Sequence, residues 1–263
     1  MQQRHKDRRL YFRELANTSR EFYLDYVEKW IHIGEGTRIL EIGCGEGGNL
    51  LPFAEKGCQV AGIDISESQI ANAELFFKEN GKEGCFTVSD FLLVPTPTDE
   101  RERFDIVLIH DVIEHIEIPQ KVQFLEHLKL FMRSDAIAFF AFPAWQMPFG
   151  GHQQICHHGA SKLPFIHLLP TGAYRTLLTK TGESEATIEG LLSIKRSRMP
   201  IERFKKLAKE TGMRVVNQTF WVINPHYRQK FGLHPLREVW PFTSIPWLRN
   251  FYTTSAWFVV KIA

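Results

Sequence analysis

The stretch ILEIGCGEGGNL, residues 39–50, decides the fold of this chain. Its first half has the apolar composition of a buried strand, and the glycines that follow, Gly43, Gly45 and Gly47, are spaced for a sharp turn into a helix. Residues without a Cβ can adopt left-handed conformations and let a ligand approach the backbone closely. Roughly twenty residues further on, Asp64 ends the next expected strand, where a carboxylate can accept hydrogen bonds from both hydroxyls of a ribose. These features predict a site for a ribose-containing ligand.

Strands and helices are expected to alternate around this loop. The apolar runs predict strands at 38–42, 59–63, 85–88, 104–110 and 136–142, and helices at 49–56, 66–80 and 121–132. Such alternation indicates a parallel sheet with right-handed crossovers, and strands rich in Ile and Val indicate that helices cover both faces. Ser66 and Gln69 are predicted to form a capping box at the start of the second helix.

The flanking segments have less regular patterns. Apolar residues at near-helical spacing over 10–30 predict one or two helices near the N-terminus. After Pro143 we expect short helices at 173–180 and 185–194, a further helix at 201–210, and strands at 214–222 and 255–262.

We expect a single domain over 1–263. Its parts would be N-terminal helices (1–33), a cofactor-binding core (36–143), an insertion at 144–200, and a C-terminal part (201–263) that carries a second insertion at 224–254. The first insertion follows the fifth strand, so it should cover the carboxyl edge of the sheet as a lid that takes part in substrate binding. Gly150, Gly151 and Gly159 offer hinges for such a lid.

Composition limits the class of protein. Hydrophobic residues make up 44% of the chain and charged residues 24%, which are values of a globular protein. The four cysteines show no C-x-x-C spacing, so a zinc ribbon or a disulfide framework is not expected. We see neither a secretory signal nor an apolar run long enough to span a membrane, and therefore expect a cytoplasmic protein.

The charge is distributed unevenly. The net charge is only +2, but residues 31–194 hold twelve Lys and Arg against twenty-two Asp and Glu, whereas residues 195–263 hold thirteen against three. This asymmetry suggests an anionic partner near the C-terminal part. The alternative is that an acidic and a basic surface are simply solvated.

Polar residues at strand ends bear on which cofactor binds. Gly43, Gly45 and Gly48 also satisfy the dinucleotide fingerprint, so an NAD(P)-dependent oxidoreductase has to be considered. A carboxylate at Glu41, just before the glycines, would repel a pyrophosphate but suits a cationic ligand with an amino group. Asp90, after the third strand, could accept a hydrogen bond from an adenine amino group.

The segment after the fourth strand reads HDVIEHI, residues 110–116, at the edge where open α/β sheets bind ligands. Taken with EIGCGEG (41–47), Asp64 and SD (89–90), it makes the chain resemble class I S-adenosylmethionine-dependent methyltransferases. The resemblance is to the broad type 11/23-like group that includes quinone-biosynthesis methyltransferases, and it covers roughly residues 36–143. It implies an α/β, Rossmann-like fold with a seven-stranded, mostly parallel sheet, helices on both faces, an antiparallel last strand, and insertions after strands five and six.

The resemblance also implies roles for residues. The glycine loop would wrap the methionine part of S-adenosyl-L-methionine, Asp64 and the following Ile65 would hold the ribose, and Phe91 would pack on the adenine beside Asp90. His110 would lie near the sulfonium. The expected cofactor-binding residues are Glu41, Gly43, Cys44, Gly45, Gly47, Asp64, Ile65, Asp90, Phe91 and His110.

Histidines are the candidates for catalysis. His110 and His115 follow the fourth strand, and His152 lies in WQMPFGGHQQICHHG, residues 145–159; any of the three could act as a base or bind the acceptor. Cys156, with the histidines around it, could suggest a metal site. No carboxylate is near in the sequence and adjacent ligands rarely point the same way, so we expect no metal.

The acceptor is expected to be a small or medium-sized molecule, such as a metabolite, a glycan or a lipid-linked precursor. Oxygen is one candidate for the methylated atom, and a carbon or amine acceptor stays open because it would need a base less. A non-catalytic cofactor-binding protein is the alternative from another class. Residues 220–258 contain eleven aromatic residues. They could form a small core, a contact between two copies, or a surface for an amphiphilic substrate or peripheral membrane contact. Nucleic acid is not an expected partner, because no RNA-binding module is recognised.

Overall fold

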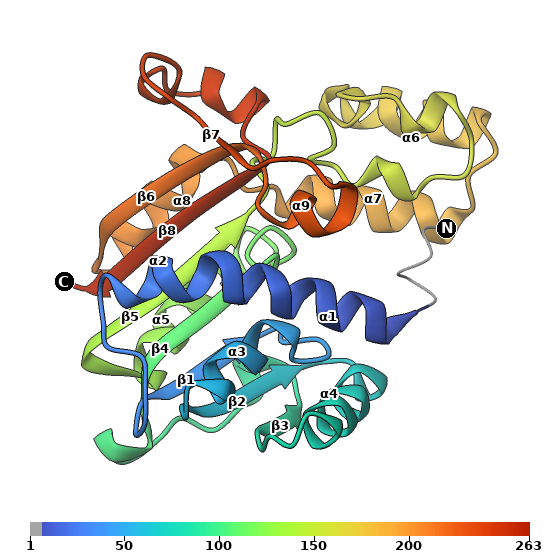
Figure 1. The fold of residues 1–263 in the computed structure, drawn as a ribbon. Coiled ribbons are helices and arrows are strands. Elements are labelled where there is room, and N and C mark those ends of the chain that lie inside the picture. The colour runs from blue at the N-terminus through green and yellow to red at the C-terminus, as the bar shows by residue number, and fades with distance from the viewer. Residues whose placement is uncertain (1–6) are drawn as a thin grey trace.

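The computed structural model describes residues 7–263, which are built around one eight-stranded sheet (Figure 1). The order across the sheet is β3-β2-β1-β4-β5-β8-β6-β7. The strands are β1 (Arg38–Ile42), β2 (Gln59–Asp64), β3 (Cys85–Val88), β4 (Phe104–His110), β5 (Met132–Phe142), β6 (Met213–Ile223), β7 (Leu236–Arg237) and β8 (Ser255–Ile262). The first five pair in parallel, and β8 is antiparallel to both β5 and β6. The predicted Rossmann-like sheet with an antiparallel last strand is confirmed; the two-residue β7 adds an eighth strand.

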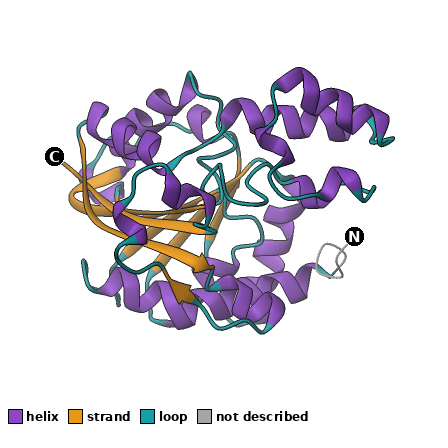
Figure 2. Cartoon of the chain, turned by 90° about the horizontal axis from the view of Figure 1, so that it is seen from above, coloured by secondary structure: helices purple, strands orange, loops and turns teal. Residues whose placement is uncertain are grey.

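Helices cover both faces of the sheet (Figure 2). Neighbouring residues of a strand point to opposite faces, and accordingly Ile39 and Leu40 belong to two different apolar clusters. The cluster around Leu40 is closed by α5 (Gln120–Phe131) and α8 (Ile201–Glu210). The cluster around Ile39 is closed by α1 (Arg8–Thr18), α2 (Leu24–Glu28), α3 (Leu51–Glu55) and α4 (Glu67–Glu79). The sheet is therefore buried on both sides, as its sequence indicates.

The N-terminal helices pack across the strands. A π-helical turn, Ser19–Tyr23, joins α1 to α2, and together they run in front of the sheet (blue in Figure 1). Tyr23 contacts the rings of Phe139 and Trp257 at centroid distances of 5.2 and 5.1 Å. The N-terminal segment is thereby fixed to β5 and β8.

The start of α4 differs from the expectation. The Ser66 hydroxyl makes no capping hydrogen bond, so the predicted capping box with Gln69 is wrong. Instead the backbone N–H of Ser66 donates to Asp64 Oδ1 at 2.9 Å. The side chains of Ser66 and Gln69 line a cavity instead of closing the helix end.

The first insertion has a small core of its own. It contains α6 (Thr171–Lys180) and α7 (Glu185–Ser197), and its buried apolar residues are Cys156, Tyr174, Leu178, Ile188, Leu191 and Leu192. The glycines expected to act as hinges are closely packed: a Cβ on Gly150 would lie 2.2 Å from the carbonyl oxygen of Trp145, and one on Gly151 2.2 Å from Cβ of His167. Glycine at these two positions therefore allows neighbouring segments to pack closely, and the two positions do not act as free hinges.

The second insertion contains α9 (His226–Phe231) and the short β7. Many of its apolar side chains are exposed, with Trp240 reaching 80%. The exposed group comprises Phe231, Leu233, Leu236, Val239, Trp240, Ile245, Trp247, Leu248 and Phe251. A small core is therefore the wrong interpretation for these residues. Within the described residues, no helix combines the length and apolarity needed to cross a bilayer.

Candidate functional site

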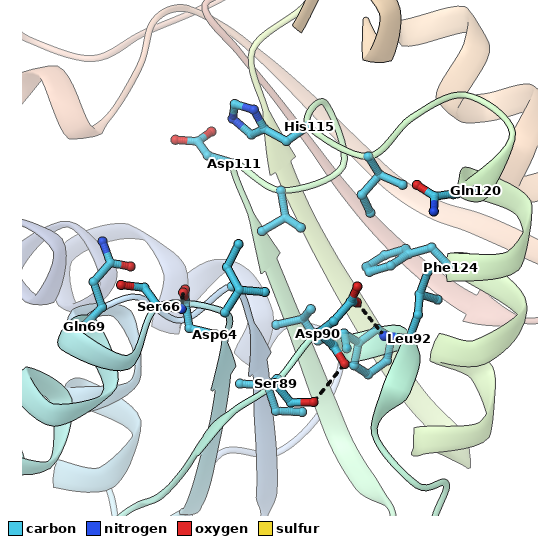
Figure 3. A pocket seen from close by; sticks show the side chains of 17 residues that line it. Asp64, Ser66, Gln69, Ser89, Asp90, Leu92, Asp111, His115, Gln120 and Phe124 are labelled. Atoms are coloured by element: carbon cyan, nitrogen blue, oxygen red, sulfur yellow. Dashed lines mark hydrogen bonds between the residues drawn. The ribbon is translucent and has the colours of Figure 1, made fainter. Parts of the chain in front are cut away.

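A cavity of about 560 Å³ opens where β1, β2 and β4 end (Figure 3). This volume is in the range of small-molecule sites. It is lined by Ile42, Gly43, Ile63, Asp64, Ile65, Ser66, Gln69, Ser89, Asp90, Phe91, Leu92, Asp111, Val112, His115, Ile116, Gln120 and Phe124. Four of these residues, Ser66, Gln69, Gln120 and Phe124, were not predicted from the sequence to line a ligand site. Their position at the starts of the helices after β2 and β4 was the available signal, because ligands of open α/β sheets bind at that edge.

The glycine loop after β1 is held against β2. Gly43, Gly45 and Gly47 have φ values of 71°, 51° and 77°. The N–H groups of Gly43 and Cys44 donate to the carbonyl oxygen of Ile63 at 2.8 and 3.1 Å. A Cβ on Gly43 would lie 2.4 Å from Cγ2 of Val112. The loop thus needs glycine for its backbone angles, and at Gly43 also for space.

Asp64 joins the loop to the cavity. Its Oδ2 accepts from Gly45 N and its Oδ1 from Ser66 N, both at 2.9 Å. A carboxylate can accept about four hydrogen bonds, so acceptor capacity remains for hydroxyls of a ligand. Ile65, next in the chain, lines the same cavity and is 78% exposed.

Glu41 precedes the cavity-lining residue Ile42 and is buried, with 1% of its surface exposed. Its Oε1 accepts from Asn49 Nδ2 at 2.7 Å, while its Oε2 has no hydrogen-bond partner in the described structure. Burial, opposed by the Asn49 hydrogen bond and assisted by the charge of Asp64, raises the pKa of Glu41 to about 8. A buried acceptor without a partner fits a ligand that brings a cationic amino group.

Asp90 and Phe91 close the side of the cavity at β3. The carboxylate of Asp90 accepts from Leu92 N at 3.0 Å and lies toward the cavity in Figure 3. Phe91 lines the cavity but is mostly buried, with its ring 5.3 Å from that of Phe124 and 5.0 Å from that of Phe131. Phe91 therefore forms part of the wall, as its proposed contact with adenine requires.

The three candidate histidines are not equivalent. His110, the last residue of β4, does not line the cavity; its ring packs 5.7 Å from that of Tyr23. His115 lines the cavity, and its ring lies 5.0 Å from that of His152 at an interplanar angle of 84°. Burial lowers the pKa of both rings, that of His152 to about 4. Both imidazoles are accordingly neutral near pH 7.

A buried carboxylate lies beside this pair. Glu114 is 4% exposed, neither of its oxygens has a hydrogen-bond partner in the described structure, and His115 Nε2 is 3.9 Å from its Oε1. One potential ligand atom from each of Glu114, His115 and His152 lies within 4.8 Å of the others. No carboxylate is near the histidine segment in the sequence, but the fold brings Glu114, almost forty residues earlier in the chain, close to His152.

The neighbouring Cys-His-His run does not converge on a site. The backbone N–H groups of His157 and His158 donate to Glu183, and the Cys156 side chain lies in the core of the insertion. Glu183 is a second carboxylate that the sequence spacing did not reveal.

Comparison with known proteins agrees with this geometry. Residues 40–138 match a family described as "Methyltransferase domain". Over these residues the chain is similar to methyltransferase domains. The resemblance drawn from the sequence is confirmed, and binding of S-adenosylmethionine or its demethylated product is typical of this family.

The curated relatives match the same region. A ubiquinone biosynthesis O-methyltransferase of a Bradyrhizobium species is 42% identical over 81 residues, which are 31% of this chain and 30% of that protein. The corresponding protein of Rhodopseudomonas palustris is 43% identical over 82 residues, 31% of each chain. The match therefore spans less than a third of the length of these relatives.

Solved structures share the whole methyltransferase fold. An S-adenosylmethionine-dependent methyltransferase from Clostridium acetobutylicum has a TM-score of 0.58 at 9% identity, with 94% of this chain and 92% of that chain covered. Magnesium protoporphyrin IX methyltransferase from Synechocystis, with S-adenosylhomocysteine bound, has a TM-score of 0.54 at 14% identity and coverage of 97% and 84%. At these identities the likeness shows the fold alone.

Proposed function

We propose that this protein transfers a methyl group from S-adenosylmethionine to an oxygen atom of a small or medium-sized acceptor. The observation that carries the proposal is the placement of three carboxylates at the same edge of three neighbouring strands: Asp64 and Asp90 line the cavity, and Glu41 is buried next to the lining residue Ile42. Each would serve one polar part of the cofactor: its amino group, its ribose hydroxyls and its adenine amino group. The partnerless Oε2 of Glu41 is the observation that favours this cofactor over a pyrophosphate-containing nucleotide.

When bound, the cofactor supplies an electrophilic methyl group. The chain has to orient the acceptor oxygen for in-line attack and accept its proton, and orientation alone contributes much of the rate. His115 lines the cavity, and the ring of His152 contacts the ring of His115. These two neutral rings are therefore better placed for proton transfer than His110. The two curated relatives described above are named as O-methyltransferases, which favours oxygen as the methylated atom.

A second cavity, of about 580 Å³, supports an anionic group on the acceptor. Its cationic lining residues are Lys195, Arg198, Arg203 and Lys206, and Trp145 and Trp247 bring the two insertions together there. Nη1 of Arg203 is buried and lacks a hydrogen-bond partner in the described residues. A phosphate or carboxylate group of the acceptor would supply the missing hydrogen-bond acceptor for this nitrogen.

The insertions favour an amphiphilic acceptor. Residues 144–200 provide His152 beside the cofactor cavity and Trp145 in the second cavity, and residues 224–254 add exposed apolar side chains next to Trp247. A glycan or lipid-linked precursor with an anionic group would match both surfaces. The first insertion would then cover the acceptor as part of the substrate site.

Isothermal titration calorimetry with S-adenosylhomocysteine and NAD⁺ tests the cofactor assignment. We expect stoichiometric binding of S-adenosylhomocysteine and none of NAD⁺; the reverse result would contradict the proposal. Methyl transfer from labelled S-adenosylmethionine into lipid and water-soluble extracts then tests the acceptor class. Label only in protein or nucleic acid would contradict a small acceptor, and no transfer to any extract would favour a non-catalytic protein.

Variants test the histidines. We expect His115→Ala and His152→Ala to lower kcat by roughly ten- to a thousandfold with little change in S-adenosylhomocysteine affinity. His158→Ala is the matched control, because His158 lies in the same segment but outside the cavity. Equal turnover in all three variants would remove His115 and His152 from the reaction.

A further inference from the structure

We propose that Glu114, His115 and His152 bind a divalent first-row transition-metal ion at the edge of the cofactor cavity. Glu114 and His115 come from the loop after β4, and His152 comes from the insertion that follows β5. The fold thus brings together one carboxylate and two imidazoles that the sequence separates. No other described group of three His, Cys, Asp or Glu side chains is placed in this way.

Glu114 is the strongest indication of a missing partner. An unpaired polar atom in a protein interior destabilises the fold, and a charged one does so more strongly. Lys121 is buried nearby, but its ammonium donates to the carbonyl oxygen of Ile113, and both oxygens of Glu114 stay without a hydrogen bond in the described structure. A cation would satisfy this carboxylate.

The ligand atoms are close enough to converge on one ion. They lie within 4.8 Å of one another. Ligand atoms at about 2.1 Å from a common ion are separated from one another by roughly 3–4 Å. Side-chain rotations that move the ligand atoms by about 1 Å would therefore complete the site. The rings of His115 and His152 lie nearly at right angles, with their centroids 5.0 Å apart.

The donor set selects the class of metal. Imidazole nitrogen suits zinc, iron, cobalt or nickel, whereas magnesium and calcium prefer sites made of oxygen. Two histidines and one carboxylate leave further coordination positions open. Because His115 also lines the cofactor cavity, an open position there could hold and polarise a hydroxyl of the acceptor. In the metal-bound form this polarisation replaces the acceptance of a proton by the two imidazoles. This last step rests on the proposed function; metal binding itself does not.

The backbone angles of two residues, one beside the site and one in it, indicate that the site is rigid. Asp111, three residues before Glu114, and His152 both have left-handed backbone angles, with φ of 52° and 58°. Such conformations are costly for residues other than glycine and are kept where the surroundings determine them. The loop after β4 and the insertion are therefore both held in defined conformations at the point where they meet.

Metal titration of the full chain tests the inference. The protein is treated with a chelator, dialysed, and titrated with Co²⁺ and Zn²⁺ by calorimetry, and the visible spectrum of the Co²⁺ form reports coordination. We expect one ion per chain and an affinity that falls by more than about a hundredfold in Glu114→Gln and His152→Ala. His158→Ala should bind as the wild type does. Circular dichroism confirms that each variant is folded.

The outcomes separate this inference from the proposed function. Absence of stoichiometric binding to the wild type, or unchanged affinity in both Glu114→Gln and His152→Ala, overturns the metal site. S-adenosylhomocysteine affinity is measured on the same chelated samples and is expected to be intact. If metal binds as described and S-adenosylhomocysteine does not, the proposed function fails and the metal site stands.

Discussion

The carboxylate of Asp64 accepts a hydrogen bond from the backbone N–H of Gly45 at 2.9 Å. Through its other oxygen, the same side chain fixes Ser66 at the start of α4. One residue at the end of β2 therefore determines the conformation of the glycine loop after β1 and also faces the cavity. Loop geometry and ligand affinity should change together when this residue is altered.

Substitution of Asp64 tests that link. Asp64→Ala removes a charged acceptor for the ribose and the anchor of Gly45, and we expect a loss of about 2–3 kcal/mol in binding of S-adenosylhomocysteine, measured by calorimetry. Asp99→Ala is the matched control, since Asp99 accepts from Arg101 N in a similar turn outside the cavity. Unchanged affinity in Asp64→Ala would contradict the cofactor site.

Substitutions at Gly43 and Gly81 distinguish the effect of steric crowding from the effect of the left-handed backbone angle. Both have positive φ, 71° and 64°, but an added Cβ meets Val112 at Gly43 and nothing within 4 Å at Gly81. We expect Gly81→Ala to cost only the left-handed conformation, about 1–2 kcal/mol. Gly43→Ala should lower Tm further and abolish S-adenosylhomocysteine binding. Equal losses of Tm, with binding retained, would mean that the loop tolerates a side chain.

Glu41 should make stability depend on pH. Its pKa is 4.5 in the unfolded reference and about 8 in the folded protein, so the folded state holds the proton more tightly. The resulting contribution to stability is fully present below 4.5 and is lost as the pH rises through about 8. Glu41→Gln cannot ionise, so its Tm relative to the wild type should increase over this interval while its affinity for S-adenosylhomocysteine falls.

Proton release provides an independent measurement at Glu41. If the ligand's amino group pairs with the ionised carboxylate, binding below pH 8 must expel a proton. Calorimetry in buffers of different ionisation enthalpy should therefore show release in the wild type and not in Glu41→Gln. Identical proton release in both proteins would assign it to another group.

Glu183 should stabilise the first insertion. Burial raises the pKa of Glu183, but hydrogen bonds from the Ser161 hydroxyl and from the N–H groups of His158 and His157 outweigh it and hold the pKa at about 2. This contribution is present above the unfolded value of 4.5 and is lost as the pH falls through about 2. At neutral pH, Glu183→Gln should cost about 2–3 kcal/mol and speed hydrogen exchange over 156–162.

The control for Glu183 is Glu185→Gln. Glu185 is exposed and pairs with Arg175 at the surface, where ion pairs contribute about 0–1 kcal/mol. Hydrogen exchange that is equally slow in both variants would show that the hydrogen bonds of Glu183 do not hold the segment.

The core of the fold was predictable because its signals are local. Strands β1, β3, β4 and β8 begin and end where the apolar runs indicate, and the carboxyl ends of parallel strands meet at one edge whatever the details of the helices. Asp64 and Asp90 could be placed at the cavity on this ground alone. The prediction of a capping box at Ser66 was wrong because the carboxylate of Asp64, two residues earlier, accepts the backbone N–H of Ser66 at the start of the helix.

The rest depended on contacts between distant residues. His152 meets His115 and Glu114 only after the insertion has folded back over β4, and the link between Glu183 and His157 spans 26 positions. No spacing rule relates such pairs. The exposure of Trp240 and Trp247 could not be predicted either, because the sequence does not distinguish an aromatic residue in a core from one on a surface.

The position of β8 has a consequence for synthesis on the ribosome. β6 joins the sheet only through β8, which follows it by some thirty residues and pairs with β5 on its other side. While the chain is growing, β1 to β5 can assemble, but β5 keeps a free edge until β8 emerges. Because most of β5 is apolar (AIAFFAF, 136–142), this interval leaves an aggregation-prone strand unprotected. The nascent chain would then depend on a chaperone or on rapid translation of the 112 residues that separate β5 from β8.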